Sequence, residues 1–260
     1  MQFLGIVLPM DFELLKYLIL PTFGFFAGFI NTMAGGGSFL TTPLLIFTGL
    51  DPTVANATNR LGIWIQSVFG FNKFRTMGYF PVRMGKVSIL PSVTGALLGS
   101  YLATIVAEDA FRKYLAFFMV IMTLVTFFKP KSSKVTEDLE KDLKNTVICS
   151  LVFFVMGIYS GFIQAGVGFL VLAYCVMSGM DYIRGNAIKM FMNLSTATLS
   201  MAVFIYNGKV VWLQGILLGL GMAAGAVIAA KFSVRAGNVF IKRFVSAAVI
   251  LFAILLLVTK

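Results

Sequence analysis

The chain has 260 residues, of which 59% are hydrophobic and 12% charged, with a mean hydropathy of +0.93. A soluble domain carries about twice that share of charged residues, so this composition excludes one and indicates a polytopic α-helical membrane protein. The net charge of +11 does not indicate nucleic-acid binding, because the basic residues fall almost wholly between apolar segments, where membrane topology already accounts for them.

The first apolar segment, residues 17–50, contains no charge and is too long for one membrane span but short for two. Gly35, Gly36 and Gly37 lie near its middle. We therefore expect one full helix, a break at these glycines and a short helix that ends near Gly49. Irregular backbone is not tolerated against lipid, so the break must be buried in protein or line a cavity.

Three more helices are expected in the first half, over residues 54–73, 83–106 and 110–128. Residues 129–144 are dense in charge and suit a solvated linker or a short surface helix. The chain is accordingly divided into a first repeat (1–128), a charged linker (129–144) and a second repeat (145–260).

The second half repeats the pattern of the first. Its first apolar run contains Gly166 and Gly168, and helices are expected over residues 183–205, 210–230 and 240–258. Gly28-Phe29-Ile30-Asn31 reappears as Gly161-Phe162-Ile163-Gln164, and Asn56-Ala57 as Asn186-Ala187, 130 positions later. Two copies of a unit with a glycine-broken helix are typical of transporters built from internal repeats.

The distribution of basic residues bears on whether these repeats are parallel or inverted. If the short helices complete a crossing, the loops at 72–86, 129–144 and 231–243 share one side with 13 Lys and Arg, against 3 in the loops on the other side. If the short helices are re-entrant, the split is 10 against 6. The positive-inside rule favours the first arrangement, which gives inverted repeats.

The glycine breaks are candidate anion sites, because a helix that begins inside the membrane presents unpaired N–H groups and the positive end of its dipole. The alternative is that the glycines only allow close helix packing. Arg60 and Lys189 lie five or six residues into the following helices, where a cation usually faces the bundle interior. They could instead extend to the membrane surface. The candidate substrate-binding residues are Asn31, Gly35, Gly36, Gly37, Ser38, Thr41, Thr42, Asn59, Arg60, Gln164, Gly166, Gly168, Lys189 and Asn193.

All ten acidic residues lie at or outside the expected span ends, and the chain has no histidine. A cation transporter or proton pump normally has a carboxylate within the membrane, and a hydrolase or metalloenzyme needs paired acids or histidines. We therefore expect no enzymatic activity, no catalytic residues, no metal and no cofactor. Amides, hydroxyls, backbone N–H groups, Arg and Lys remain, and these groups recognise anions.

Several segments resemble the sulfite exporter TauE/SafE family of bacterial membrane proteins. They are Ala27-Gly28-Phe29-Ile30-Asn31, Ala34-Gly35-Gly36-Gly37-Ser38, Ala57-Thr58-Asn59-Arg60, Lys189 with Asn193, and Asn207-Gly208-Lys209-Val210-Val211-Trp212 before Gly225. The resemblance covers nearly the whole chain and implies a transporter of sulfur-containing anions such as sulfite, thiosulfate or sulfonates. The chain departs from the family at Asn31, where an acid is common in the branch it looks closest to, and at Val167, which interrupts the second glycine run.

These observations lead us to expect a multi-pass protein of the cytoplasmic (inner) membrane. It would act as a secondary transporter or facilitated exporter of a small oxyanion, by alternating access between the two repeats. Its partners would be the anionic substrate and the lipid bilayer, and a homo-oligomer is left open. The alternative is a non-transporting scaffold or receptor. A polar cavity between the glycine breaks would support transport, and breaks packed tightly with Phe and Leu would support a scaffold.

Overall fold

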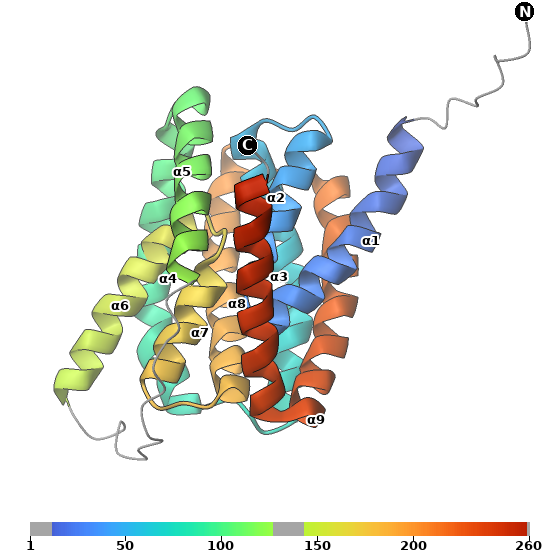
Figure 1. The fold of residues 1–260 in the computed structure, drawn as a ribbon. Coiled ribbons are helices and arrows are strands. Elements are labelled where there is room, and N and C mark those ends of the chain that lie inside the picture. The colour runs from blue at the N-terminus through green and yellow to red at the C-terminus, as the bar shows by residue number, and fades with distance from the viewer. Residues whose placement is uncertain (1–11, 127–142, 259–260) are drawn as a thin grey trace, which may run out of the picture.

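The computed structural model describes residues 12–126 and 143–258, and the regular structure in these ranges is entirely helical (Figure 1). The helices are α1 (Phe12–Met33), α2 (Ser38–Phe47), α3 (Pro52–Thr76), α4 (Val82–Ile105), α5 (Glu108–Thr126), α6 (Leu143–Phe162), α7 (Val167–Met177), α8 (Tyr182–Tyr206) and α9 (Trp212–Val258). Most of the linker expected at 129–144 lies outside the described residues.

The expectation of an all-α membrane protein is confirmed. Among the described residues, Val82–Ile105, Tyr182–Tyr206 and Trp212–Ile241 are long and apolar enough to cross a membrane. Large apolar side chains are exposed on the outside of the bundle, for example Leu90 and Leu151 at 69% and 60%. A soluble protein does not leave so many such side chains in water, whereas lipid accommodates them.

Both expected helix breaks are present. The first separates α1 from the ten-residue helix α2, and the second separates α6 from the eleven-residue helix α7. The backbone at Gly35 and Gly166 has φ of 93° and 81°, which L side chains rarely adopt, so the glycines allow the chain to leave the helix there. A third irregularity, at Gly237 with φ 76° and ψ 172°, divides α9 into two segments.

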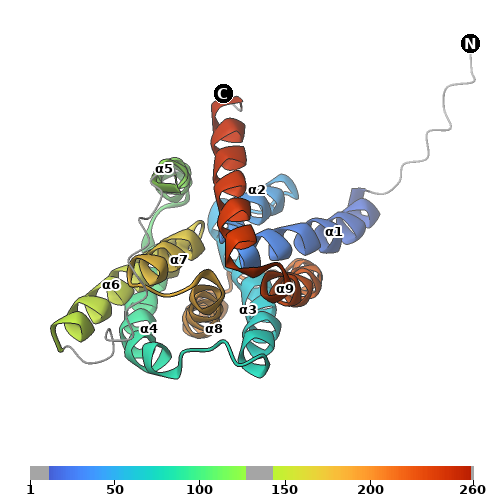
Figure 2. The same ribbon diagram turned by 60° about the horizontal axis from the view of Figure 1, so that its bottom comes forward.

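The central helices α3 and α8 lie side by side and run in opposite directions. Arg60, near the start of α3, lies against Phe204 near the end of α8, and Phe74 at the end of α3 packs with Ile183 at the start of α8. Viewed toward one end of the bundle, α8 lies among α3, α4, α7 and α9 (Figure 2).

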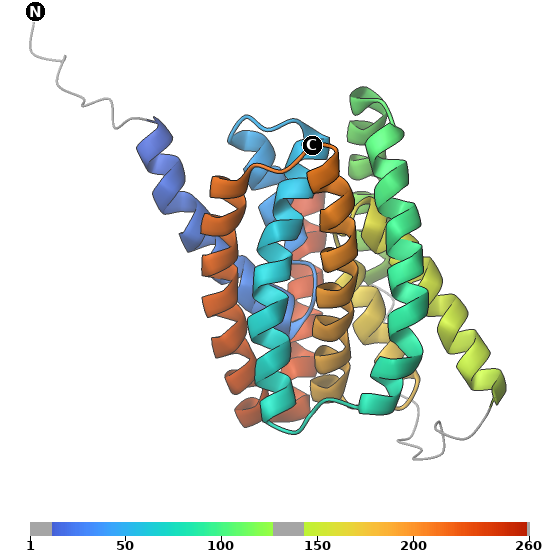
Figure 3. The ribbon, with the colours of Figure 1, turned by 180° about the vertical axis from the view of Figure 1, so that it is seen from behind.

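The outer helices exchange partners between the two halves of the chain, because α1 packs against α9 and α6 packs against α4. Glycines bring these backbones together: a Cβ on Gly28 would lie 2.3 Å from the carbonyl oxygen of Met222, and one on Gly161 would lie 2.2 Å from that of Ala96. Such contacts are typical of membrane helices. Figures 1 and 3 show α4 and the first segment of α9 running in opposite directions, as inverted repeats would require.

Candidate functional site

The two glycine breaks lie against each other in the interior of the bundle. A Cβ on Gly35 would approach the carbonyl carbon of Gly168 to 2.5 Å, so the two backbones touch. Phe39 and Phe169, in the first turns of α2 and α7, stack with their ring centroids 6.3 Å apart and their planes 24° apart. The breaks are therefore closed in this structure, with aromatic side chains packed beside them.

Four helix ends meet around this contact: the C-termini of α1 and α6 and the N-termini of α2 and α7. Helix termini leave backbone groups without intrahelical partners, negative at the C-terminus and positive at the N-terminus. The first turns of α2 and α7 contain no acidic residue. Among the side chains that the structure describes, Arg60 and Lys189 are the only charged ones that are buried, and both are fully buried.

Lys189 closes the C-terminus of α1. Its Nζ donates to the carbonyl oxygens of Asn31 at 2.6 Å and Thr32 at 2.9 Å, and to Oδ1 of Asn186 at 2.6 Å. An ammonium group has three N–H donors, so all of them are used. A cation at a helix C-terminus also interacts favourably with the helix dipole, so Lys189 stabilises the end of α1 inside the protein.

The side chains around Lys189 form a connected hydrogen-bond network, which we call the Lys189 centre (Lys189, Asn186, Asn31, Thr32 and Gln66). Asn31 donates through Nδ2 to Oε1 of Gln66 at 3.0 Å and accepts at Oδ1 from the backbone N–H of Gly37 at 3.3 Å. Gln66 in turn donates to Oγ1 of Thr32 at 3.1 Å. Each of these polar side chains has a partner within the network.

Arg60 has the corresponding position at the C-terminus of α6. Its Nη1 donates to Oε1 of Gln164 at 3.0 Å and its Nη2 to the carbonyl oxygen of Gly161, while its guanidinium carbon lies 4.9 Å from the ring centroid of Phe204. Ser160 hydrogen-bonds with Thr196 at 3.1 Å and donates to Gln164 at 3.4 Å. We call Arg60, Gln164, Gly161, Ser160 and Thr196 the Arg60 centre.

The Arg60 centre differs from the Lys189 centre because two of its donors have no partner. Nε of Arg60 and Nε2 of Gln164 are buried and make no hydrogen bond. A buried donor without a partner costs about 1–3 kcal/mol, so native proteins rarely leave one without a reason. Gln164 also has φ of 69°, which is uncommon for a residue other than glycine.

The remaining candidates from the sequence are divided between these centres and a separate contact. Asn31 and Gly37 lie at the Lys189 centre, and Gln164 at the Arg60 centre. Thr41, Thr42 and Asn59 link α2 to α3, through hydrogen bonds of 2.7 Å from Thr41 to Asn59 and 3.2 Å from Asn59 to Thr42. Gly36 packs against the ring of Phe169, and Gly166 lies directly before the first residue of α7. Ser38 and Asn193 are buried, and Oδ1 of Asn193 has no hydrogen-bond partner.

Gln66 and Thr196 belong to the two centres but were not selected from the sequence. Each lies seven residues, or two helical turns, after a residue that was noticed: Gln66 after Asn59 and Thr196 after Lys189. Residues seven apart share one face of a helix. This spacing could have identified both residues from the sequence, because each is a polar side chain on an apolar helix, on the same face as a residue that was selected.

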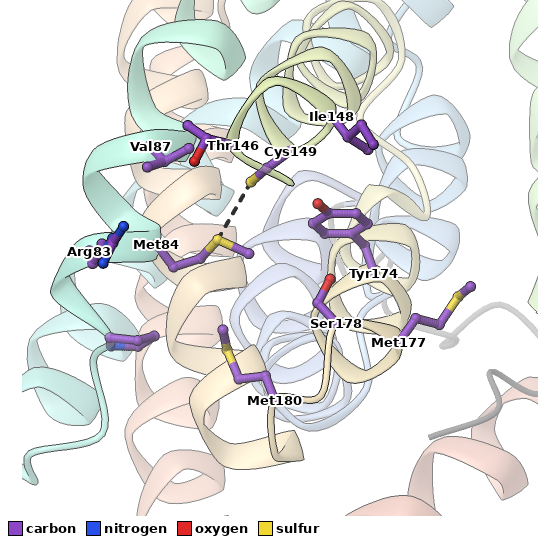
Figure 4. A pocket seen from close by; sticks show the side chains of 11 residues that line it. Arg83, Met84, Val87, Thr146, Ile148, Cys149, Tyr174, Met177, Ser178 and Met180 are labelled. Carbon is purple, nitrogen blue, oxygen red and sulfur yellow. Dashed lines mark hydrogen bonds between the residues drawn. The ribbon is translucent and has the colours of Figure 1, made fainter. Parts of the chain in front are cut away.

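A separate pocket of about 340 Å³ lies where α4 and α6 begin and α7 ends (Figure 4). Met84, Cys149 and Tyr174 are among its lining residues, and Sγ of Cys149 lies 3.6 Å from Sδ of Met84. None of the candidate residues selected from the sequence lines this pocket. The pocket is therefore separate from the two centres around the glycine breaks.

Comparison with known proteins gives a consistent result over nearly the whole chain. Residues 20–256 match the family model described as "Sulfite exporter TauE/SafE". The chain is 31% identical to a "Probable membrane transporter protein ORF9" of Sinorhizobium sp. over 95% of this chain and 93% of that protein. It is 29% identical to a "Probable membrane transporter protein" of Haemophilus influenzae, over 91% and 92%, and 27% identical to the Escherichia coli K12 "Probable membrane transporter protein YfcA", over 83% and 80%. No solved structure matches the chain.

Proposed function

Because the chain belongs to the sulfite exporter TauE/SafE family of membrane transporters, we propose that it carries a small oxyanion across the cytoplasmic membrane. The substrate would be a sulfur-containing anion such as sulfite, thiosulfate or an organosulfonate. Transport would proceed as secondary transport or facilitated export, with residues 1–128 and 145–260 acting as the two repeats. The protein would cross the membrane several times.

The observation that carries this proposal is the charge of the interior. Two cations, Arg60 and Lys189, are fully buried where the broken helices meet, and no carboxylate is buried among the side chains that the structure describes. The positive ends of α2 and α7 lie in the same region. A region with this charge attracts anions and repels cations.

The predicted site residues would share the work of recognition. Gly35, Gly36, Gly37, Gly166 and Gly168 would let backbone N–H groups approach the anion. Arg60 and Lys189 would supply positive charge. Neutral hydrogen bonds would come from Asn31, Ser38, Thr41, Thr42, Asn59, Gln164 and Asn193.

The closed glycine breaks bear on the choice between a transporter and a scaffold. Packing of Gly35 against Gly168 beside two Phe rings is what a scaffold would require. Membership of a transporter family favours transport, and we therefore take this arrangement as the closed state of the cycle. Substrate passage would require the two breaks to separate, first toward one side of the membrane and then toward the other.

Flux into liposomes tests the proposal directly. Purified protein would be reconstituted, and uptake of radiolabelled sulfite, thiosulfate and taurine measured against liposomes without protein. We expect protein-dependent flux of at least one of these compounds. If none of them enters faster than in protein-free liposomes, the oxyanion transporter is wrong and the scaffold reading takes its place.

A further inference from the structure

The two buried cations make the same type of contact in the two halves, but they do not have the same capacity to bind a ligand. Lys189 gives its three N–H donors to oxygens of the protein, at 2.6, 2.9 and 2.6 Å. An anion could gain a hydrogen bond from Lys189 only by displacing one of these partners. The Lys189 centre is therefore complete without a ligand.

Both polar atoms of the Asn31 side chain, which corresponds to Gln164 in the first half, have partners in the protein. Asn31 uses Nδ2 on Gln66 and Oδ1 on the N–H of Gly37. Gln66 uses Nε2 on Thr32. Each of these amide nitrogens therefore has a hydrogen-bond partner in the protein, whereas Nε2 of Gln164 has none.

The Arg60 centre, in contrast, contains donors without hydrogen-bond partners. Nε of Arg60 and Nε2 of Gln164 have no partner, although both side chains are at least 98% buried. The two groups are in direct contact, because Nη1 of Arg60 donates to Oε1 of Gln164 at 3.0 Å. This contact also fixes the orientation of the amide, since a reversed amide would place two donors face to face.

Resting on the function proposed above and narrowing its set of site residues, we infer that the oxyanion binds at the Arg60 centre, through Nε of Arg60 and Nε2 of Gln164. The Lys189 centre, including Asn31, is then a structural clamp on α1 and does not contact the anion. Guanidinium and amide N–H groups both donate to oxyanions, and the guanidinium also supplies the charge. The binding site is then asymmetric, although the fold that contains it repeats.

The hydroxyl groups of Ser160 and Thr196 lie beside this donor pair. They are hydrogen-bonded to each other at 3.1 Å, and either oxygen could be the donor. Ser160 also donates to Oε1 of Gln164 at 3.4 Å, and Thr196 to the carbonyl oxygen of Met192 at 2.9 Å. A hydroxyl group can rotate to suit a new acceptor, so one of the pair becomes a third donor to the anion only by leaving its present acceptor. The two unpartnered donors, one of them on the cation, suit a small oxyanion with several equivalent oxygens.

The test measures how far thiosulfate or sulfite raises the unfolding temperature of the purified protein. Each anion is titrated, and sodium gluconate at the same concentrations is the control salt. A ligand that binds only the folded state raises this temperature, and the rise grows with the logarithm of the ligand concentration relative to its Kd. Gln164→Met removes the unpartnered donor, and we expect the apparent affinity to fall about tenfold. Gln66→Met is the matched change at the Lys189 centre. It should lower the unfolding temperature without anion and leave the apparent affinity unchanged.

Gln164→Glu is a second variant, for the case that Gln164→Met fails to fold. The carboxylate keeps the acceptor for Nη1 of Arg60 and adds an opposite charge, so the anion-free unfolding temperature should equal or exceed that of the parent. The unpartnered donor is replaced by an oxygen, so the response to thiosulfate should be lost. A purely structural Gln164 would not gain stability and lose its anion response together.

The outcomes separate this inference from the proposed function. If both Gln164 variants respond to the anions like the parent, or if Gln66→Met weakens binding as much as Gln164→Met, the inference is wrong. If the parent protein responds to neither anion and carries no flux, the proposed function itself fails, and the inference fails with it.

Discussion

Asn56 and Asn186 make equivalent hydrogen bonds, each to the end of the broken helix in the other half of the chain. Nδ2 of Asn56 donates to the carbonyl oxygen of Phe162 at 3.0 Å, and Nδ2 of Asn186 donates to that of Met33 at 3.1 Å. Phe162 and Met33 are the last residues of α6 and α1. Each central helix therefore holds the broken helix of the other half, and the halves are interlocked where they would have to separate during transport.

Replacement of Lys189 tests how much this interlocking contributes to stability. Lys189→Met would leave the carbonyl oxygens of Asn31 and Thr32 buried without their donor, and we expect a loss of about 3 kcal/mol. Thermal unfolding in detergent measures this loss. Lys209→Met, in the connection between α8 and α9, is the control and should unfold like the parent. Equal unfolding temperatures for the two variants would show that Lys189 is not a clamp.

The contact between the glycine breaks can be separated from the backbone strain of a positive φ. Gly35 and Gly49 have φ of 93° and 97°, but a Cβ on Gly35 would lie 2.5 Å from Gly168, whereas one on Gly49 would meet nothing within 4 Å. Gly49→Ala should cost only the strain, about 1–2 kcal/mol, and retain flux. Gly35→Ala adds a clash with backbone, so we expect a larger loss of stability and of flux.

The two alanine variants are compared in their unfolding temperature and in their flux into liposomes. The difference between them reports the effect of the contact between the breaks, without the strain of a positive φ. If Gly35→Ala and Gly49→Ala behave alike, the breaks do not need to touch. The closed arrangement of the breaks would then play no part in transport.

The positions of most helices could be predicted because charges and glycines mark where apolar segments end. A helix was expected at 83–106 and α4 spans Val82–Ile105; another was expected at 183–205 and α8 spans Tyr182–Tyr206. The prediction of the bounds within α9 was less accurate. Two helices were expected there, at 210–230 and 240–258, and α9 does consist of two segments, but the first continues past residue 230 and the division falls at Gly237.

The partners of the buried cations could not be predicted from the sequence. Depth within a helix indicated that Arg60 and Lys189 face the interior, and the structure places both there. However, Lys189 contacts the carbonyl of Asn31, 158 residues away in the chain. That contact depends on how α8 packs against the end of α1, which no local pattern encodes. The division into repeats of 1–128 and 145–260 also stays a prediction.

The orientation in the membrane can be tested with two introduced cysteines. Lys209 lies three positions before the first residue of α9, Trp212, and Arg235 lies two positions before the kink at Gly237, so the two flank the first segment of α9. A cysteine at Lys209 should react with an impermeant thiol reagent from outside the cell, and one at Arg235 only from inside. The native Cys149 and Cys175 are buried, and the parent protein measures their background. Labelling of both positions from one side would contradict the topology.

The aromatic pair beside the breaks gives a test of the closed state. Phe169 stacks on Phe39, and its ring also fills the space next to Gly36. Phe169→Ala should leave a cavity between α2 and α7 and lower the unfolding temperature, as large-to-small changes in packed interiors do. If the pair blocks the path in the closed state, the variant should also admit taurine faster relative to sulfite, because the larger molecule gains more from the added space. Phe117→Ala is the control, since Phe117 is 57% exposed on α5, and this change should alter neither property. A Phe169→Ala variant with the parent's ratio of taurine to sulfite flux would place the barrier elsewhere.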